Sequence, residues 1–331
     1  MSSDLLISVN NLDRQYGSLQ AVQDVSFELR RGEVLGFLGP NGAGKSTTMQ
    51  IITGNLAPSS GQVKICGIDL LDNPRQAKAR IGYLPERPPL YRELSVDEYL
   101  VFCTQINRIP KPQRQAALQR AKQRCGLEQV GRRLINNLSK GYQQRVGIAQ
   151  AIIHSPDIVV LDEPTVGLDP IQIREIRHLI RELANEHAVI LSTHILPEVQ
   201  MTCNRVQIIN QGRLVFSDDI DSLNRSMRAR SLILGLQQPP SQDELETSLK
   251  DIDAVESIEV LGDGRWRIQH AEQQNPATRI AEIAVQNNWG LIELSPETRS
   301  LEQIFIDITA TEQSLPESSE FISKATEGEA A

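Results

Sequence analysis

The feature that most constrains the fold is the run GPNGAGKST, from Gly39 to Thr47. It follows EVLGFL, an apolar segment typical of a β-strand, and precedes KSTTMQIITG, which is typical of a helix ending at Gly54. A strand, a glycine-rich turn and a helix in this order direct successive backbone N–H groups toward one point. The helix N-terminus adds partial positive charge there. The stretch therefore predicts a phosphate-binding loop.

Every fixed position of the pattern G-x-x-x-x-G-K-[ST] is filled in this loop. Gly42 and Gly44 allow the backbone torsions that turn N–H groups inward. Lys45 is expected to reach the β- and γ-phosphates, and Ser46 to bind Mg²⁺. The expected nucleotide contacts from this loop are Gly39, Asn41, Gly42, Ala43, Gly44, Lys45, Ser46 and Thr47.

A second strand, IVVLDEP, ends in two carboxylates. Carboxylates at the end of a buried apolar strand are costly unless they have a function. We predict that Asp162 acts on the Mg²⁺ ion and that Glu163 orients or deprotonates the water attacking the γ-phosphate. A strand-end pair can instead cap a helix, but that reading loses weight beside a phosphate loop.

The next strand of the pattern, AVILSTH, ends at His194. A strand-end histidine by itself is more often an ordinary polar residue than a catalytic one. Ligands bind at the carboxyl ends of parallel strands, so we expect His194 to contact the γ-phosphate. The expected catalytic residues are therefore Lys45, Glu163 and His194.

The strand and helix pattern divides the chain into three parts. Residues 1–217 alternate strands and helices, and the apolar β-branched runs predict an α/β domain with a mostly parallel sheet covered on both faces. Residues 218–311 read as β-α-β-β-α-β, the order of a small α+β ferredoxin-like accessory domain, with a GDG hairpin turn at Gly262–Gly264 and a last helix at 300–309. Residues 312–331, rich in Ser, Glu and Ala, are expected to be a disordered acidic tail.

Composition and charge narrow the classes of function. A formal net charge of −8 argues against general affinity for nucleic acid or anionic lipid. The apolar runs fall well short of the roughly 20 residues needed to span a bilayer, and no secretory signal is recognisable at the N-terminus. The four cysteines are scattered, which favours free thiols in a reducing, cytosolic compartment over disulfides.

The stretch NLSKGYQQRVGIAQAI, from Asn137 to Ile152, presents a small polar turn at a helix start but no catalytic pair. With the phosphate loop, the Asp-Glu strand and the strand-end histidine in this order, the sequence resembles the ATP-binding subunit of ABC transporters. In that family this stretch is the signature motif, usually written LSGGQ. The resemblance implies a P-loop NTPase fold of ABC type, in which Ser139 and Gly141 cap the ATP held by a second copy paired head to tail.

Other positions take their roles from the same resemblance. Tyr16 matches the aromatic residue that stacks on adenine, although it could be an ordinary strand tyrosine. Asp169, in VGLDP, matches the loop that crosses the dimer interface. Glu86, in YLPERPP, stands where the family commonly has a glutamine that senses Mg²⁺ and the attacking water; a carboxylate there could still bind Mg²⁺, or be merely solvated. Lys140 and Tyr142 replace the second glycine and the glutamine of the signature.

The resemblance predicts an ATPase that uses ATP and Mg²⁺. Two copies of the chain would form a homodimer, and this homodimer would bind a separately encoded integral membrane permease. The chain would lie on the cytoplasmic face of the membrane, and the YLPE segment, similar to that of gliding-motility-like and drug-resistance-like ATPases, favours export. The alternatives are a soluble ABC-type ATPase acting on a protein or nucleic-acid assembly, and a nucleotide-binding scaffold without turnover. The accessory domain is expected to be a structural or dimer-supporting module, with a regulatory ligand site as the alternative.

Substituting Glu163→Gln separates an ATPase from a scaffold. If Glu163 acts on the attacking water, the variant loses Mg²⁺-dependent phosphate release but still forms dimers when ATP is added. Both are measured by phosphate release and by size-exclusion chromatography with and without ATP. A wild-type chain that shows no turnover even with its membrane partner present would contradict the transporter mechanism.

Overall fold

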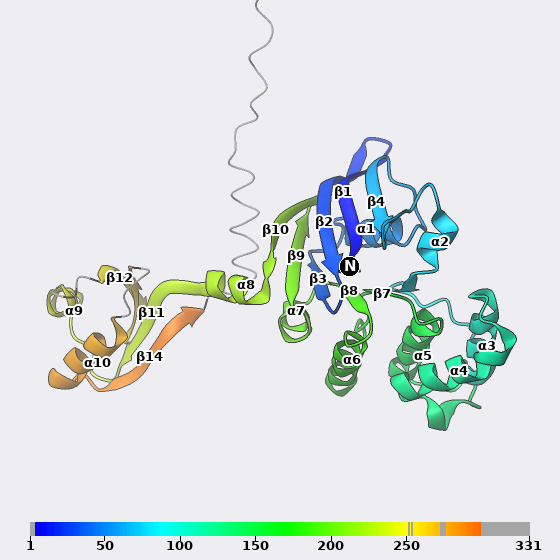
Figure 1. The fold of residues 1–331 in the computed structure, drawn as a ribbon. Coiled ribbons are helices and arrows are strands. Elements are labelled where there is room, and N and C mark those ends of the chain that lie inside the picture. The colour runs from blue at the N-terminus through cyan, green and yellow to red at the C-terminus, as the bar shows by residue number, and fades with distance from the viewer. Residues whose placement is uncertain (1–3, 251, 253, 272–275, 299–331) are drawn as a thin grey trace, which may run out of the picture. The chain divides into compact units, whose positions relative to one another are not determined.

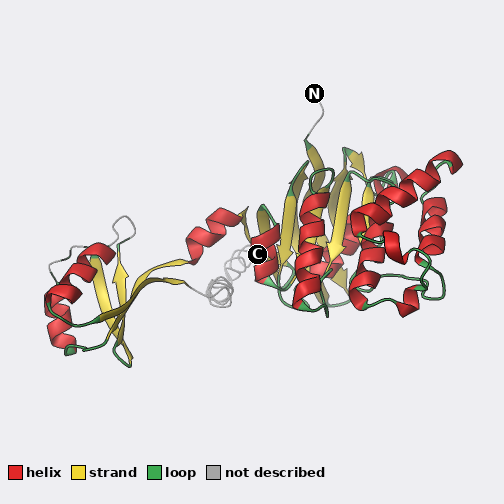
Figure 2. Cartoon of the chain, turned by 90° about the horizontal axis from the view of Figure 1, so that it is seen from below, coloured by secondary structure: helices red, strands yellow, loops and turns green. Residues whose placement is uncertain are grey.

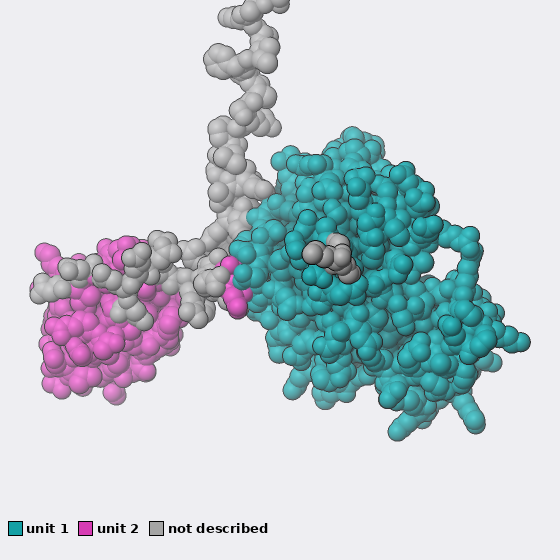
Figure 3. Space-filling view, in the orientation of Figure 1, with its two compact units in different colours: residues 1–220 teal, residues 221–331 magenta. Residues whose placement is uncertain are grey.

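The structure, a computed structural model, describes residues 4–250, 252, 254–271 and 276–298. The chain forms two compact units, residues 1–220 and 221–331 (Figure 3). The helix expected at 300–309 and the acidic tail expected at 312–331 lie outside the described residues.

Unit 1 contains two sheets (Figures 1 and 2). The first is antiparallel, in the order β2-β1-β4-β5, with strands β1 (Leu5–Tyr16), β2 (Leu19–Arg30), β4 (Ser60–Ile65) and β5 (Ile68–Asp69). The second has the order β10-β9-β3-β8-β7-β6, from β3 (Val34–Leu38), β6 (Ile81–Leu84), β7 (Ile158–Asp162), β8 (Ala188–Thr193), β9 (Arg205–Asn210) and β10 (Arg213–Asp219). All its pairings are parallel except that of β10 with β9, which confirms the predicted mostly parallel sheet.

The second sheet is buried on both faces. Along β7, Ile158 and Val160 belong to a core shared with the first sheet, whereas Val159 and Leu161 face a second core. Helix α1 (Lys45–Ile52) contributes Met49 and other apolar side chains to the first of these cores and contacts both β2 and β7. Alternate residues of one strand therefore serve two cores, which explains its uninterrupted apolar sequence.

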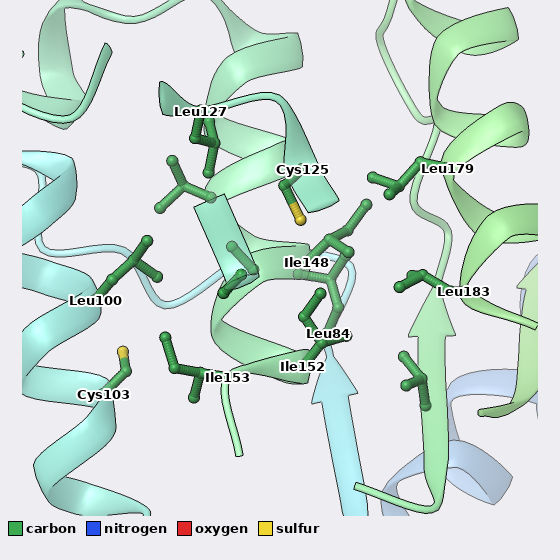
Figure 4. Packing of buried hydrophobic residues seen from close by; sticks show 14 of the residues in the cluster. Leu84, Leu100, Cys103, Cys125, Leu127, Ile148, Ile152, Ile153, Leu179 and Leu183 are labelled. Carbon is green, nitrogen blue, oxygen red and sulfur yellow. The ribbon is translucent and has the colours of Figure 1, made fainter. Parts of the chain in front are cut away.

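The second core lies under helices on the opposite face of the parallel sheet (Figure 4). It joins Leu84 of β6 to Leu100, Leu127, Ile148 and Leu183 from the helical segments around it. The helices of unit 1 besides α1 are α2 (Pro74–Lys78), α3 (Val96–Ile106), α4 (Lys111–Cys125), α5 (Lys140–Ile152), α6 (Pro170–Leu183) and α7 (Leu196–Thr202), with 3₁₀ turns at Glu128–Val130 and Ile135–Asn137.

After α8 (Ile220–Met227), unit 2 contains β11 (Arg228–Leu236), α9 (Gln242–Leu249), β12 (Val255–Gly262), β13 (Arg265–His270), α10 (Ala277–Gln286) and β14 (Leu291–Thr298). The strands form one antiparallel sheet in the order β12-β13-β11-β14, as in a ferredoxin-like domain. Asp263 and Gly264 make the β12–β13 turn with φ of 50° and 71°. Trp266, Leu245 and Ile280 lie in the core between this sheet and α9 and α10.

None of the helices in the described residues is long and apolar enough to cross a bilayer.

Candidate nucleotide site

The ends of four neighbouring parallel strands carry most of the expected site residues. In the sheet order β3-β8-β7-β6, Leu38 of β3 pairs with Thr193 of β8, and Ser192 of β8 pairs with Asp162 of β7. The phosphate loop, His194 and the Asp-Glu pair therefore begin at one edge of the sheet, and the segment with Glu86 follows β6 at the same edge. Because β8 lies between β3 and β7, this is a point at which ligands bind in such sheets.

The loop from Gly39 to Thr47 needs its glycines for two reasons. A Cβ on Gly39 would lie 2.4 Å from Ile209 O, and a Cβ on Gly44 would lie 2.5 Å from Ala21 O, so both positions lack room for a side chain. Gly42 has open space but a φ of 82°, and Gly44 has a φ of 107°; these are conformations that favour glycine. Asn41 and Gly42 are exposed, Ala43 is buried, and Ser46 and Thr47 are half-buried at the start of α1. The result is a turn that opens at Gly42 and leads into the helix N-terminus, as an anion site requires.

Lys45 is buried within the loop that precedes it. Its Nζ donates hydrogen bonds to Gly39 O at 2.8 Å and Pro40 O at 3.1 Å. The same ammonium lies 3.5 Å from Glu163 Oε1. The phosphate loop thus contains a positive charge that forms an ion pair with the Glu163 carboxylate, directly after the end of β7.

Glu163 also pairs with the histidine of the next strand. His194 Nδ1 lies 2.9 Å from Glu163 Oε2, and the imidazole is partly exposed while the carboxylate is buried. The backbone of Glu163 is left-handed, with φ of 50°, although its N–H donates to Ser192 O at 2.9 Å. Such a conformation in a residue with a Cβ costs about 1–3 kcal/mol and is found at functional sites. It aims a buried carboxylate at the edge where the phosphate loop and His194 meet.

Asp162 is buried, and its Oδ1 has no hydrogen-bond partner in the part of the chain that the structure describes. Burial raises the pKa of its carboxyl above the ordinary value, an effect that the Ser192 and Ser46 side chains only partly offset. A buried anionic oxygen without a partner, near the hydroxyl of Ser46, fits a hard cation. Among the described residues no group of three or more His, Cys, Asp or Glu could hold a metal. We propose that Ser46 and Asp162 would hold Mg²⁺, whose other ligands would be phosphate oxygens and water, and that Mg²⁺ would neutralise phosphate charge there.

Glu86 and Tyr16 lie at the margins of this site. Glu86 is exposed, and its negative charge is one of the smaller causes that raise the pKa of Asp162, so it faces the same edge. Tyr16 is 42% exposed at the end of β1. The Arg14 guanidinium lies over the Tyr16 ring, 4.5 Å from its centroid, and donates to Ala57 O at 3.1 Å. A tethered arginine on one face leaves the other face of an exposed ring for stacking.

The signature turn is exposed and begins α5. Ser139 is the N-cap, and its hydroxyl accepts a hydrogen bond from Tyr142 N at 3.4 Å. Gly141 is buried, and a Cβ there would lie 2.7 Å from Cδ of the flexible Gln172 side chain on α6, which would have to shift. Within the described residues, no hydrogen bond or ion pair joins Ser139 or Gly141 to the phosphate loop of the same chain.

Lys140 and Asp169, which the sequence singled out, both have contacts within the chain. The Lys140 ammonium lies against Gly167, where a Cβ would come within 2.0 Å of it. Asp169 caps α6, accepting hydrogen bonds from Ile171 N and Gln172 N at 2.9 Å each. The structure therefore links the signature turn to the loop after β7 inside one chain.

Sequence reasoning did not single out three buried polar residues behind the site: Glu198 and the two threonines that donate hydrogen bonds to it, Thr165 and Thr193. The threonines of EPT and LSTH, each within two residues of an expected catalytic residue, were the available signal.

A parallel sheet with a glycine-rich loop, a buried lysine and an Asp-Glu pair at its strand ends defines a P-loop nucleotide-binding protein. The profile of the family described as "ABC transporter" matches residues 22–166. The bacitracin transport ATP-binding protein BcrA of Bacillus licheniformis is 32% identical over 92% of this chain and 97% of its own length. The chain belongs to the ABC transporter family and is the ATP-binding, ATP-hydrolysing subunit of such a transporter.

Solved structures agree with this assignment. CbiO1 from Clostridium perfringens, described as part of the ABC transporter complex cbiONQ, is 29% identical over 67% of this chain and 91% of that one, with a TM-score of 0.62. MJ0796, described as a dimeric bacterial ABC transporter cassette, is 25% identical over 65% of this chain and 99% of that one, with a TM-score of 0.60. Each match covers about as much of the chain as unit 1 contains. Both confirm the predicted ABC-type P-loop fold.

Asp162→Asn tests whether the buried carboxylate is kept for a metal. Because the folded protein raises the pKa of Asp162, the ionised form costs stability, and the cost is present at neutral pH but absent below the ordinary pKa of a carboxyl. We expect the variant to gain about 1 kcal/mol in free energy of unfolding at pH 7, and to need at least about tenfold more Mg²⁺ for half-maximal turnover.

Chemical denaturation at pH 7 and pH 4, together with Mg²⁺ titration of phosphate release, measures both effects. Asp72→Asn, at an exposed position, is the matched control and should change neither. An Asp162→Asn variant with wild-type Mg²⁺ dependence would contradict the metal site.

Proposed function

We propose that two copies of this chain pair head to tail around two ATP and drive export through a separately encoded integral membrane permease. The observation that carries the proposal is the signature turn. Ser139 is exposed at a helix N-terminus and makes its hydrogen bond only within that turn, with no contact to its own phosphate loop in the described residues. The Ser139 hydroxyl accepts a hydrogen bond within the turn and keeps its O–H to donate, so an exposed helix start with this donor suits an anion supplied by another chain.

The residues at the strand ends would then each have a separate role in ATP hydrolysis. Lys45 would contact the β- and γ-phosphates, and its pairing with Glu163 would be replaced by pairing with phosphate. Glu163 would take or orient a proton of the attacking water, in the position that its buried carboxylate holds beside His194. His194, partly exposed, would contact the γ-phosphate, and Tyr16 would stack on adenine. Glu86 would approach the Mg²⁺ side of the site.

A groove beside the Glu86 segment supports a separate partner. A cavity of about 460 Å³ is lined by Pro85 and Pro89 from that segment and by polar side chains that include Lys78, Gln150 and His154. The exposed ring of Tyr91 follows on the same segment and packs on Tyr99 and Phe102. Exposed aromatic and polar side chains around a hollow are typical of a protein-binding surface. We propose that the permease docks here and so holds the chain on the cytoplasmic face of the membrane.

The relatives add support of a different kind. BcrA is described as a bacitracin transport protein, and it aligns with this chain over nearly its whole length, accessory domain included. CbiO1 is described as part of a transporter complex and MJ0796 as a dimer. Export of a substance through a partner, by a dimer of ATPase chains, is the function that joins these descriptions to the geometry.

Mixing two inactive variants tests the shared site. Lys45→Ala removes the phosphate contact, and Ser139→Asp keeps an N-cap side chain but puts a carboxylate where the γ-phosphate would lie. Each alone should be inactive. Their mixture should recover up to about a quarter of wild-type turnover, because about half of the dimers are mixed and each mixed dimer has one intact site.

Ser139→Asn is the matched control, since it caps the helix without the charge and should lose far less activity. A mixture that stays inactive and forms no dimers with ATP would contradict the head-to-tail pairing.

Affinity purification of the full chain from detergent-solubilised membranes of its host tests the partner. We expect a polytopic membrane protein in near-stoichiometric amount. Recovery with ribosomes, DNA or a soluble assembly instead would favour the soluble ATPase and reject the transport role, while leaving ATP hydrolysis intact.

A further inference from the structure

A buried carboxylate behind the site has no role in the chemistry described so far. Glu198, in the first turn of α7, is 1% exposed. Its Oε1 accepts a hydrogen bond from Thr165 Oγ1 at 2.5 Å, and its Oε2 accepts one from Thr193 Oγ1 at 2.9 Å. The Arg177 guanidinium on α6 lies 3.8 Å from Oε1. Both oxygens of Glu198 thus accept hydrogen bonds, one from a hydroxyl in the loop after β7 and one from the last residue of β8.

Those two hydroxyls flank the expected catalytic pair. Thr165 follows Glu163 by two residues, and Thr193 directly precedes His194. The Thr193 hydroxyl also accepts a hydrogen bond from Ile195 N at 3.1 Å, so it holds the backbone on both sides of His194. The Thr193 hydroxyl thus accepts from Ile195 N and donates its proton to Glu198.

The loop after β7 is held in the same way. Thr165 O accepts a hydrogen bond from Leu168 N at 3.2 Å, and Val166 N donates to Glu163 O at 3.3 Å, so the turn at Thr165 is continuous with the backbone of Glu163. That backbone is the left-handed one described above. A strained residue keeps its conformation only if its surroundings hold it there.

We propose that Glu198 is a positioning residue for ATP hydrolysis: by accepting hydrogen bonds from Thr165 and Thr193 it fixes the Glu163 loop against the His194 loop. The 2.9 Å approach of Glu163 Oε2 to His194 Nδ1 is the geometry that it maintains. The inference rests on the roles proposed above for Glu163 and His194.

Stability alone does not explain this carboxylate. Removing a charge from water costs several kcal/mol, and a cation 3.8 Å away from one oxygen returns only part of that. A buried apolar side chain would stabilise α7 at lower cost, but it could not accept two hydrogen bonds from two loops. The arrangement is therefore specific to joining the loops.

Glu198→Gln is the most informative change, because it keeps the shape and removes one acceptor. The amide nitrogen cannot accept a hydrogen bond, so either Thr165 or Thr193 loses the acceptor for its hydroxyl proton. Turnover depends on the relative placement of Glu163 and His194, whereas ATP binding depends on the phosphate loop. We expect kcat to fall about tenfold or more, with KM for ATP within about twofold of wild type.

Glu182→Gln is the matched control. Glu182 is an exposed glutamate on α6 that lies 3.3 Å from His178, and its substitution should leave kcat and KM unchanged. Thermal unfolding of all variants, with turnover expressed per folded molecule, separates positioning from loss of fold.

A second pair of variants keeps the test decisive if Glu198→Gln folds poorly. Thr193→Ser retains the hydroxyl and should retain most of kcat, whereas Thr193→Val lacks it and should lose kcat as Glu198→Gln does. If Glu198 acts through Thr193, the double variant Thr193→Val with Glu198→Gln is little worse than either single variant.

Two outcomes overturn the proposal. One is an unchanged kcat per folded molecule in Glu198→Gln; the other is equal activity of Thr193→Ser and Thr193→Val. Glu163→Gln, measured alongside, distinguishes the failures. If Glu163→Gln also keeps its turnover, the proposed roles of the site residues are wrong, and if it alone loses turnover, only the role of Glu198 is wrong.

Discussion

The parallel hydrogen-bond register of β3, β8 and β7 is the constraint on which the rest of the structure depends. Pairing Leu38 with Thr193 and Asp162 with Ser192 brings loops from distant parts of the sequence to one edge, since neighbouring strands lie about 4.8 Å apart. A slip of one residue would exchange the faces of β7, expose Ile158 and its neighbours to the wrong core, and move Asp162 off the edge. The two cores thus hold the register, and the register assembles the site.

Several charged side chains are buried near this edge of the sheet, and each is stabilised by different hydrogen-bond or ion-pair partners. Lys45 is held by two carbonyls, Glu163 by Lys45 and His194, and Glu198 by two hydroxyls. Asp162 keeps one oxygen without a hydrogen-bond partner among the described residues. The free-energy cost of these groups must be offset by the apolar cores on both faces of the sheet, which explains why strands carrying polar ends are otherwise wholly apolar.

Much of this could be predicted from the sequence, because the relevant signals are local. The runs ending at Asp162 and Thr193 are uninterrupted and β-branched, and the loop from Gly39 to Thr47 is a contiguous motif. The strand β6 was not predicted: its four residues include Gly82, prolines follow, and its pairing with β7 rather than propensity makes it a strand. Helices α3 and α4 were not singled out either, since α4 is polar around most of its surface and buries mainly small residues. Glu198 was missed because an acidic residue in a first helical turn looks ordinary, and its partner Thr165 lies 33 residues away.

The left-handed backbone at Glu163 has a consequence for how such a chain evolves. A glycine or asparagine at this position would relieve the local strain, and the strain is tolerated only while the carboxylate is needed. In a lineage that no longer required ATP turnover, substitution of residue 163 by glycine or asparagine would increase the stability of the fold. No second mutation would be needed to compensate for it. Loss of activity by substitution at this position is therefore easier than its return. In a copy of this domain that has lost ATPase activity, we expect residue 163 to be among the first to be substituted.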